Sequence, residues 1–319
     1  MPTPLGSKPH PVINALMRLA VSRGLPEAPA TDEPAKPSPL FAALMRRRPS
    51  IPIRDEHLIG PDGDRLRVRI YDPKLPGSLP VLIHAHGGGF KVGSPEECDT
   101  HLSTLAHEVG MVVVSVDYRM IPKHPYPAAL DDLISAVEWV VDNAARLRVN
   151  PARMAFTGGS AGGNLALALG LALPKHLPQP RLLLLAEPWC DLSAPSAPSP
   201  STAAFYALFE ESHQVCRDEY AGDIPVDDPR VSPGLSPDLG TLPPTVVLVG
   251  DLDLLVPTHV ALVERLRKAG VPSVLHVFPG LIHGTAAFTR LRPARDYELA
   301  CIAHLRSELV VPFLEENRP

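Results

Sequence analysis

From residue 81 onward, short apolar runs alternate along the chain with longer helical stretches. The runs are almost purely apolar, as in strands that are buried on both faces of a sheet. They comprise Val81–Ala85, Met111–Val116, Arg153–Thr157, Arg181–Ala186, Thr245–Val249 and Ser273–Phe278. Between them lie the helical stretches Ala128–Arg146, Ala161–Leu173 and Val256–Ala269. This alternation predicts a mostly parallel sheet with helices on both faces, and in such sheets the chemistry lies at the carboxyl ends of the strands.

The rest of the chain departs from this alternation. Arg65–Tyr71 alternates polar and apolar residues, which predicts a strand with one wet face near a sheet edge. Val12–Arg23 and, more briefly, Pro39–Arg48 carry apolar stripes of helical period. Asp191–Pro244 is rich in Pro and Ser and only weakly helical around Ser212–Tyr220. We therefore expect an insertion over the active-site end of the sheet, with two short N-terminal helices docked on it.

Composition narrows the function classes. The chain has 319 residues, 45% of them hydrophobic, which suffices for one large core or two modest ones. Its formal net charge is -5 and its basic residues are scattered, so we expect a small neutral molecule as partner and no nucleic acid. The N-terminus is not leader-like and no run approaches the roughly 20 apolar residues of a membrane span. We expect a cytoplasmic protein without membrane insertion, and a homodimer is compatible with these features.

The four cysteines show no CxxC pairing and no companion ligands at zinc-like spacing. They are Cys98, Cys190, Cys216 and Cys301. We expect buried free thiols, which suit a reducing cytoplasm, and no metal.

A glycine-rich stretch, GGSAG at Gly158–Gly162, joins the strand that ends at Thr157 to an apolar helix. Glycines on both sides of Ser160 permit a sharp strand-to-helix turn that exposes its hydroxyl at the tip of the sheet. The adjoining helix N-terminus favours developing negative charge. An ordinary turn could also be rich in glycine, but the order strand, serine, helix favours a nucleophile.

The motif HGGG at His86–Gly89 follows the strand that ends at Ala85. Its glycines can present backbone N–H groups to an oxyanion, together with the N–H of Ala161. Alone, this motif could be a flexible turn or a phosphate nest. Together with the serine turn it indicates an oxyanion hole.

A serine nucleophile needs a base and a carboxylate that orients the base, and after such a turn they follow in the order acid, histidine. Asp251 and Asp253 follow the strand that ends at Val249, and His283 follows the strand that ends at Phe278. Other histidines lie inside predicted elements, where structural roles are the default: His259, His276 and His304. His283 is therefore the predicted base, and either aspartate could be the acid.

Several blocks of the sequence, in this order, resemble the bacterial hormone-sensitive-lipase-like (family IV) esterases of the α/β-hydrolase superfamily. The blocks read HGGGF from His86, SVDYRMIPKHPYPAAL from Ser115, GGSAGGN from Gly158, PWCDLS from Pro188, DPRVSPGLSPDLGTLPPTVV from Asp228, GDLDLL from Gly250 and GLIHG from Gly280. The resemblance covers the chain from about Arg65 to its end.

The resemblance implies an α/β-hydrolase fold, in which a mostly parallel eight-stranded sheet with an antiparallel second strand is flanked by helices. It also implies a small helical cap. We expect the cap to comprise residues 1–50 and 191–240, and the hydrolase core to comprise residues 51–190 and 241–319.

The family's functional residues carry over position by position. The triad would comprise Ser160 as nucleophile, His283 as base and Asp253, preferred to Asp251, as acid. The oxyanion donors would be Gly88, Gly89 and Ala161, with His86 bracing the glycine loop.

Some positions depart from the family pattern or bear on the pocket. Gly159 precedes the serine where the family usually has Asp or Thr, and Leu254 follows the acid where it usually has Pro. Glu187 ends the sixth strand, near the acyl pocket, where the family generally has an uncharged residue. We expect Glu187 to turn to solvent or to pair with an arginine. The bulky Phe90 and Trp189 are expected beside the acyl site.

These observations predict a serine carboxylesterase that hydrolyses short- to medium-chain carboxylic esters through an acyl-enzyme, without a cofactor. An amidase, an acylaminoacyl-peptidase or a lactonase could use the same triad, although the chain is too short for the propeller domain of such peptidases. A non-catalytic small-molecule receptor on the same scaffold is an alternative of another class. Such receptors lose the triad histidine, whereas His283 is present.

Overall fold

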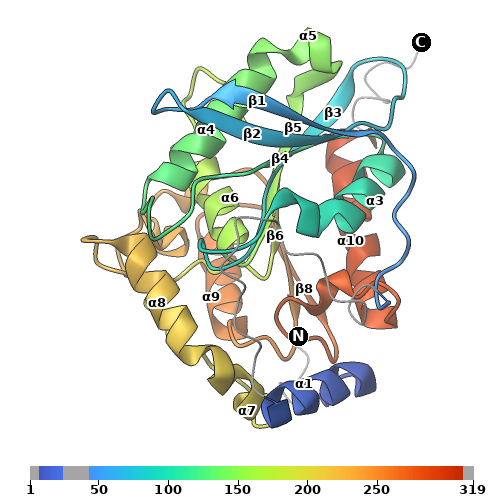
Figure 1. The fold of residues 1–319 in the computed structure, drawn as a ribbon. Coiled ribbons are helices and arrows are strands. Elements are labelled where there is room, and N and C mark those ends of the chain that lie inside the picture. The colour runs from blue at the N-terminus through green and yellow to red at the C-terminus, as the bar shows by residue number, and fades with distance from the viewer. Residues whose placement is uncertain (1–6, 24–42, 312–319) are drawn as a thin grey trace.

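The computed structural model describes residues 7–23 and 43–311, and its centre is one twisted sheet (Figure 1). The strands lie in the order β1-β2-β4-β3-β5-β6-β7-β8. Their bounds are β1 Ile53–Ile59, β2 Arg65–Tyr71, β3 Leu79–Ala85, β4 Val112–Val116, β5 Val149–Gly159, β6 Leu182–Ala186, β7 Thr245–Gly250 and β8 Ser273–Phe278. β2 is antiparallel to both of its neighbours, and the other pairs are parallel. The predicted sheet, with its antiparallel second strand, is confirmed.

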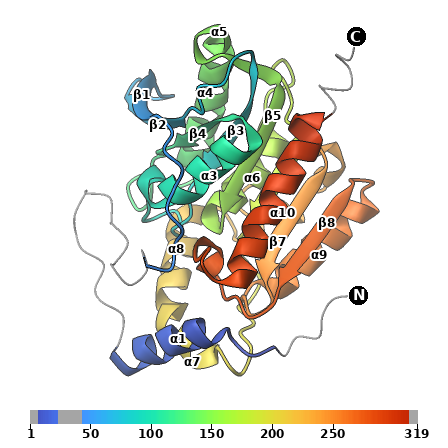
Figure 2. The ribbon, with the colours of Figure 1, turned by 90° about the vertical axis from the view of Figure 1, so that its right-hand side faces the viewer.

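Helices cover both faces of this sheet. On one face α3 (Asp99–Val109) packs against α10 (Arg292–Leu309), as Figure 2 shows. On the other face α4 (Ala128–Asp142) packs against α6 (Ala161–Ala172), and α9 (Val256–Lys268) packs on β7 and β8. The first ten residues of α6 are all buried because β5 and β6 lie on one side of it and α4 on the other. This helix therefore begins in the interior, directly after Ser160.

The predicted strands and helices agree with these bounds to within a few residues, apart from the predicted helices 39–48 and 128–146. The latter is interrupted at Asn143 and continues as the short α5 (Ala144–Leu147). β1 was not predicted, because its sequence IRDEHLI lacks a run of apolar residues. Because β1 lies at the sheet edge and pairs only with β2, it needs few apolar side chains.

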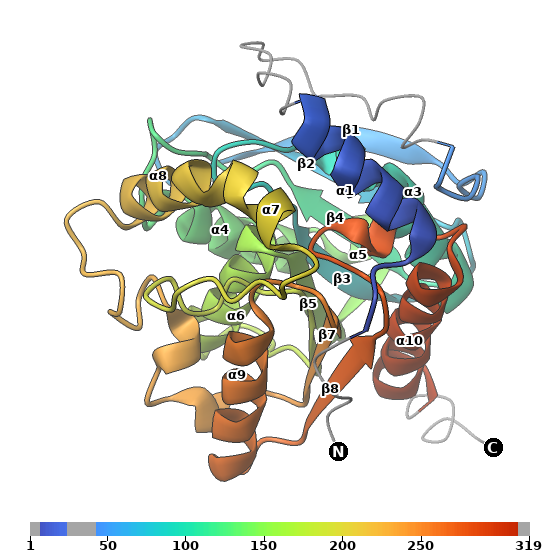
Figure 3. The same ribbon diagram turned by 90° about the horizontal axis from the view of Figure 1, so that it is seen from below.

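Helices from two distant parts of the chain lie together at one end of the molecule, which Figure 3 shows from below. They are α1 (Pro11–Arg23), α7 (Ala203–Tyr206) and α8 (Glu210–Ala221). α1 packs against α7 and buries Ile13 and Met17, so the N-terminal helix docks on the insertion as expected.

The second predicted N-terminal helix, Pro39–Arg48, lies partly outside the described residues. Residues 43–48 form a turn followed by chain without regular secondary structure, so that part of the prediction is wrong. The reason is a competing set of hydrogen bonds. Leu44 accepts from the N–H of Arg290, and the N–H of Arg46 donates to the Thr289 hydroxyl, which takes these backbone groups away from a helical ladder.

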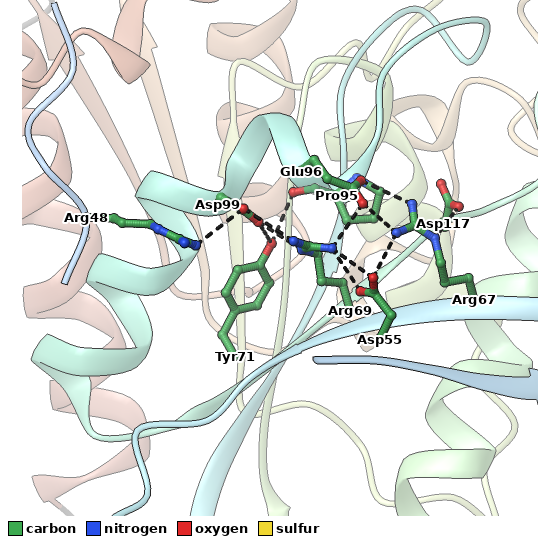
Figure 4. A network of polar contacts seen from close by, with 9 residues as sticks. All are labelled: Arg48, Asp55, Arg67, Arg69, Tyr71, Pro95, Glu96, Asp99 and Asp117. Carbon is green, nitrogen blue, oxygen red and sulfur yellow. Dashed lines mark hydrogen bonds and ion pairs between the residues drawn. The ribbon is translucent and has the colours of Figure 1, made fainter. Parts of the chain in front are cut away.

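Arginines of β2 tie the sheet to the segment that follows the HGGG motif (Figure 4). Arg67 forms two hydrogen bonds with Glu96, and Arg69 contacts Glu96 (3.0 Å) and Asp99 (2.9 Å). The hydrogen bond from Arg67 lowers the pKa of Glu96 to about 2 and so keeps this carboxylate ionised at neutral pH. Glu96 lies shortly after Gly89 in the sequence, so this network fixes the segment that follows the glycine loop.

Two predictions from composition concern the cysteines and membrane insertion. All four thiols are free, three of them buried and Cys98 partly exposed. In the part of the chain that the structure describes, each helix is too short or too polar to span a bilayer.

Candidate active site

Ser160 lies at the turn between β5 and α6. Its backbone has φ 54° and ψ -118°, a combination that residues with a Cβ rarely adopt. Its N–H donates to the carbonyl of Ala186 (2.9 Å), and its own carbonyl accepts from the N–H groups of Asn164 (3.0 Å) and Trp189 (3.0 Å). These bonds to the end of β6 and the start of α6 hold the strained conformation.

Two glycines allow this turn to approach its neighbours. A Cβ on Gly162 would lie 2.1 Å from the carbonyl oxygen of Ala85, and one on Gly158 would lie 2.1 Å from the carbonyl oxygen of Gly162. Gly159 differs, because a Cβ there would make an ordinary contact 3.8 Å from Ala186. Position 159 therefore has room for a Cβ, although this chain has glycine there where the family usually has Asp or Thr.

His283 bridges Ser160 and Asp253. Its Nε2 lies 2.9 Å from Ser160 Oγ, and its Nδ1 lies 2.7 Å from Asp253 Oδ2. When Asp253 is ionised, Nδ1–H donates to the carboxylate, and Nε2 is left to accept the proton of the serine hydroxyl. The backbone N–H of His283 donates to the hydroxyl of Tyr206 (2.9 Å), a contact from α7 that sequence reasoning missed.

Asp253 is fully buried and is fixed by its own loop. Its Oδ1 accepts the backbone N–H of Leu255 (2.7 Å), which leaves Oδ2 for His283. Leu254, in place of the family's proline, does not displace this carboxylate.

Asp251 has other partners. Its Oδ1 accepts the N–H of Gly280 (2.7 Å), and its Oδ2 accepts from the hydroxyl of Ser7. The carbonyl of Gly280 in turn accepts the N–H of His10 (3.0 Å). Asp251 thus fastens the loop that carries His283 to the N-terminal segment, while Asp253 contacts the imidazole.

The electrostatics of this pair favour the ionised form of both groups. Burial by itself raises the pKa of Asp253, but the charge and hydrogen bond of His283 outweigh it and the pKa is lowered. Burial likewise lowers the pKa of His283, but Asp253 and then Glu187 outweigh it and raise the pKa to about 9. The imidazolium that forms when a serine proton is transferred is therefore stabilised before any substrate arrives.

The glycine loop after β3 folds into a tight turn. Gly88 has φ 116° and Gly89 has φ 62°, and a Cβ on Gly88 would lie 1.9 Å from the carbonyl oxygen of Val92. Among the described residues, none accepts a hydrogen bond from the N–H of Gly88, Gly89 or Ala161. These donors are available for an oxyanion beside Ser160.

The contacts of His86 hold this loop. Its Nδ1–H donates to the carbonyl of Gly87 (2.8 Å), and its ring stacks on Tyr118 with 4.2 Å between centroids. The Tyr118 hydroxyl donates to the His86 carbonyl (2.8 Å). Tyr118 belongs to the SVDYRM block, whose part in holding the loop could not be read from sequence.

A small cleft of about 60 Å³ opens over Ser160 and His283. Trp189 lines it, as expected. Residues spaced three and four apart along α8 form a polar wall: Glu210, His213, Gln214 and Arg217. The helical spacing is visible in the sequence, but the face that turns toward Ser160 is not.

Phe90 lies beside Trp189, which lines the cleft, with 6.1 Å between their ring centroids. Phe90 itself is buried and is not among the residues that line the cleft. Its ring stacks on Tyr220 of α8 with 3.6 Å between centroids, so Phe90 packs under α8.

Glu187 was expected to turn to solvent or to pair with an arginine, and this expectation is wrong. Its side chain is buried, makes no ion pair with an arginine among the described residues and does not line the cleft. Its carboxylate lies with Asp253 and His283, and one ligand atom of each falls within 4.8 Å of the others, close enough in principle to hold a metal ion. However, Nδ1 of His283 is bonded to Asp253 and Nε2 to Ser160, so we assign these side chains to a hydrogen-bonded network.

Comparison with known proteins identifies the family. The sequence profile of a family described as having the alpha/beta hydrolase fold matches residues 82–287. The chain belongs to this family. The resemblance to hormone-sensitive-lipase-like esterases is thereby confirmed.

Individual relatives agree with this assignment. The chain is 36% identical to an ethyl acetate hydrolase of Pseudomonas putida, over 72% of this chain and 74% of that protein. It is 35% identical to the carboxylesterase NlhH of Mycobacterium tuberculosis, over 75% of this chain and 77% of that protein. The structure of a hyperthermophilic esterase from the archaeon Pyrobaculum calidifontis superposes with a TM-score of 0.81 at 28% identity, covering 94% of this chain and 98% of that one.

The glycine contacts predict a sharp contrast in stability. Gly162→Ala should lower the free energy of unfolding by about 3 kcal/mol or more, because the new methyl group meets backbone that cannot move aside. Gly159→Ala, the matched control, should change it by less than about 1 kcal/mol. Urea unfolding followed by circular dichroism measures both, and equal effects would contradict the close approach of the turn to β3.

Proposed function

We propose that this protein is a serine carboxylesterase that acts through an acyl-enzyme. The observation that supports this most strongly is the hydrogen-bonded chain from Ser160 through His283 to Asp253, in which Ser160 and His283 line a cleft. Among the described residues, the N–H of Ala161, next to Ser160 in the chain, has no acceptor. Acyl transfer needs groups of these kinds: a nucleophile, a base and N–H donors for an anion.

In the proposed reaction, Ser160 Oγ attacks the ester carbonyl carbon while His283 Nε2 takes its proton. The carbonyl oxygen becomes an oxyanion that accepts hydrogen bonds from Gly88, Gly89 and Ala161. Collapse of this intermediate breaks the ester C–O bond, and the imidazolium protonates the departing alkoxide. A water molecule activated by His283 then attacks the acyl-enzyme and releases the acid, which restores Ser160.

Amide and lactone hydrolysis would use the same groups, so these activities are the second candidates. The relatives reported above are named as hydrolases of esters, which favours esters for this chain. A non-catalytic receptor is disfavoured because His283 is hydrogen-bonded to both of its partners.

We further propose that residues 1–50 and 191–240 act as one cap over the core segments 51–190 and 241–319. Contact between α1 and α7 and the hydrogen bond from His283 to Tyr206 support this division. Free cysteines in the described structure support a cytoplasmic location.

Replacing the nucleophile tests the proposed reaction. Ser160→Ala should reduce hydrolysis of p-nitrophenyl butyrate by several powers of ten and leave the circular dichroism spectrum unchanged. Ser196→Ala, which removes a hydroxyl from the wall of the same cleft, should retain most activity. Retention of more than about a tenth of the activity by Ser160→Ala would contradict the assignment.

The two aspartates should separate in the same assay. Asp253→Asn should lower kcat by about 10⁴, because an amide favours the wrong imidazole tautomer. Asp251→Asn should cost far less activity and act mainly on thermal stability, since its partners are Gly280 and Ser7. If the ranking of kcat were reversed, Asp251 would be the acid.

Chain length is predicted from the cleft. The cleft is small, Trp189 lines it and its α8 wall is polar, so p-nitrophenyl esters with acyl chains of about two to six carbons should have the highest kcat/KM. Trp189→Ala should move the optimum to longer chains, whereas Trp139→Ala, on α4, should not. Higher efficiency of the wild type on laurate than on butyrate would refute this preference.

A further inference from the structure

Glu187 is a buried carboxylate in a conformation that few residues adopt. It directly follows β6, has φ 49° and is 5% exposed. Its N–H donates to the carbonyl of Leu248 in β7 (2.9 Å), which fixes the backbone from which the side chain projects. Burial of a charged group beside a strained backbone needs a compensating interaction.

The compensating groups belong to the loop that carries His283. Glu187 Oε2 accepts the backbone N–H of Gly284 (2.7 Å) and lies 3.9 Å from His283 Nδ1. Within the described chain, Oε1 has no hydrogen-bond partner. The Nδ1 edge of the imidazole therefore faces two carboxylates, Asp253 in contact and Glu187 just beyond hydrogen-bond distance.

We propose that Glu187 is a positioning residue whose negative charge, together with that of Asp253, stabilises the positive charge that His283 acquires during acyl transfer. This inference rests on the proposed function, in which His283 is the base. The bond to Gly284 holds the loop, and the carboxylate charge acts on the imidazole through space. A purely structural role would need only the hydrogen bond to Gly284 and not the negative charge of the carboxylate.

Few other titratable groups face His283 and Glu187. From the neighbouring elements they are Asp253 and His259, Tyr206 and His213, and Tyr297 of α10. Burial raises the pKa values of both tyrosines and lowers those of His213 and His259, so these four groups are neutral at neutral pH. Glu210 and Arg217 of α8, which have opposite formal charges, line the cleft together with His283. Asp253 and Glu187 are the carboxylates beside the imidazole, at 2.7 and 3.9 Å from Nδ1.

The sign of the effect follows from the role of His283. The base must be neutral, so kcat/KM rises with pH through the pKa of His283 in the free enzyme. A second negative charge raises that pKa and moves this acid limb to higher pH. Burial raises the pKa of Glu187 itself to about 7, so the charge is present from neutral pH upward.

The matched test is Glu187→Gln, which keeps the size, the backbone conformation and an acceptor for Gly284 but removes the charge. The acid limb of kcat/KM should move to lower pH by about one unit, and the plateau should fall by roughly three- to tenfold. Glu298→Gln, which neutralises a buried glutamate on α10, is the control and should leave the limb in place. An unmoved limb in a folded Glu187→Gln protein would overturn the proposal and leave Glu187 a structural acceptor.

A second pair of variants tests the same idea without the charge of Asp253. In Asp253→Ala, burial lowers the pKa of His283, and Glu187 is the carboxylate that still opposes this effect. Adding Glu187→Gln to Asp253→Ala should therefore lower the pKa measured by NMR titration of the His283 ring further. Equal pKa values in the two variants would overturn the proposal.

Titration of the active site with an organophosphonate separates this inference from the proposed function. Wild-type protein that neither reacts at Ser160 nor hydrolyses esters would contradict the proposed function itself. Wild-type protein that reacts normally, combined with an unmoved acid limb in Glu187→Gln, would contradict the role of Glu187 alone.

Discussion

The backbone of Ser160 is strained, and the surrounding structure is built so that this strain can persist. Positions 158 and 162 accept only glycine, because the backbone of the turn lies in van der Waals contact with the end of β3 and with the first turn of α6. The same close approach brings the start of α6 next to the HGGG loop, since a Cβ on Gly162 would lie 2.4 Å from the carbonyl oxygen of His86. If the turn relaxed, the nucleophile, the helix N-terminus and the glycine loop would separate together.

The other half of the site depends on the loop that carries His283. This loop is held by Asp251 at Gly280, by Asp253 at the imidazole, by Glu187 at Gly284 and by Tyr206 at the backbone N–H. Three of these contacts are made by carboxylates that follow β6 and β7, and the fourth is made by Tyr206 of α7. The N-terminal segment contacts the same region, because the Ser7 hydroxyl donates to Asp251 and the N–H of His10 donates to the carbonyl of Gly280.

Much of this could be predicted from sequence, for a physical reason. Buried parallel strands and the glycine turn have strict local requirements, so their positions follow from apolar runs and from GGSAG. The environment of a side chain that packs on residues distant in sequence could not be predicted in this way. Phe90 adjoins the HGGG motif yet packs on Tyr220, and Glu187 was expected in solvent because carboxylates usually are. The edge strand β1 was missed because it pairs only with β2 and lacks an apolar run. The turn at residues 43–48 was missed because its partners, Thr289 and Arg290, lie far away in the chain.

The proposed reaction requires that Ser160 is a nucleophile activated by His283. The most direct measurement is mass spectrometry of the intact and digested protein after reaction with paraoxon, an organophosphate that modifies activated serines. We expect one diethyl phosphoryl group per chain, on Ser160, and a rate of modification that falls by orders of magnitude in His283→Ala. Absence of an adduct, an adduct on another residue, or an unchanged rate in the histidine variant would contradict these roles of Ser160 and His283.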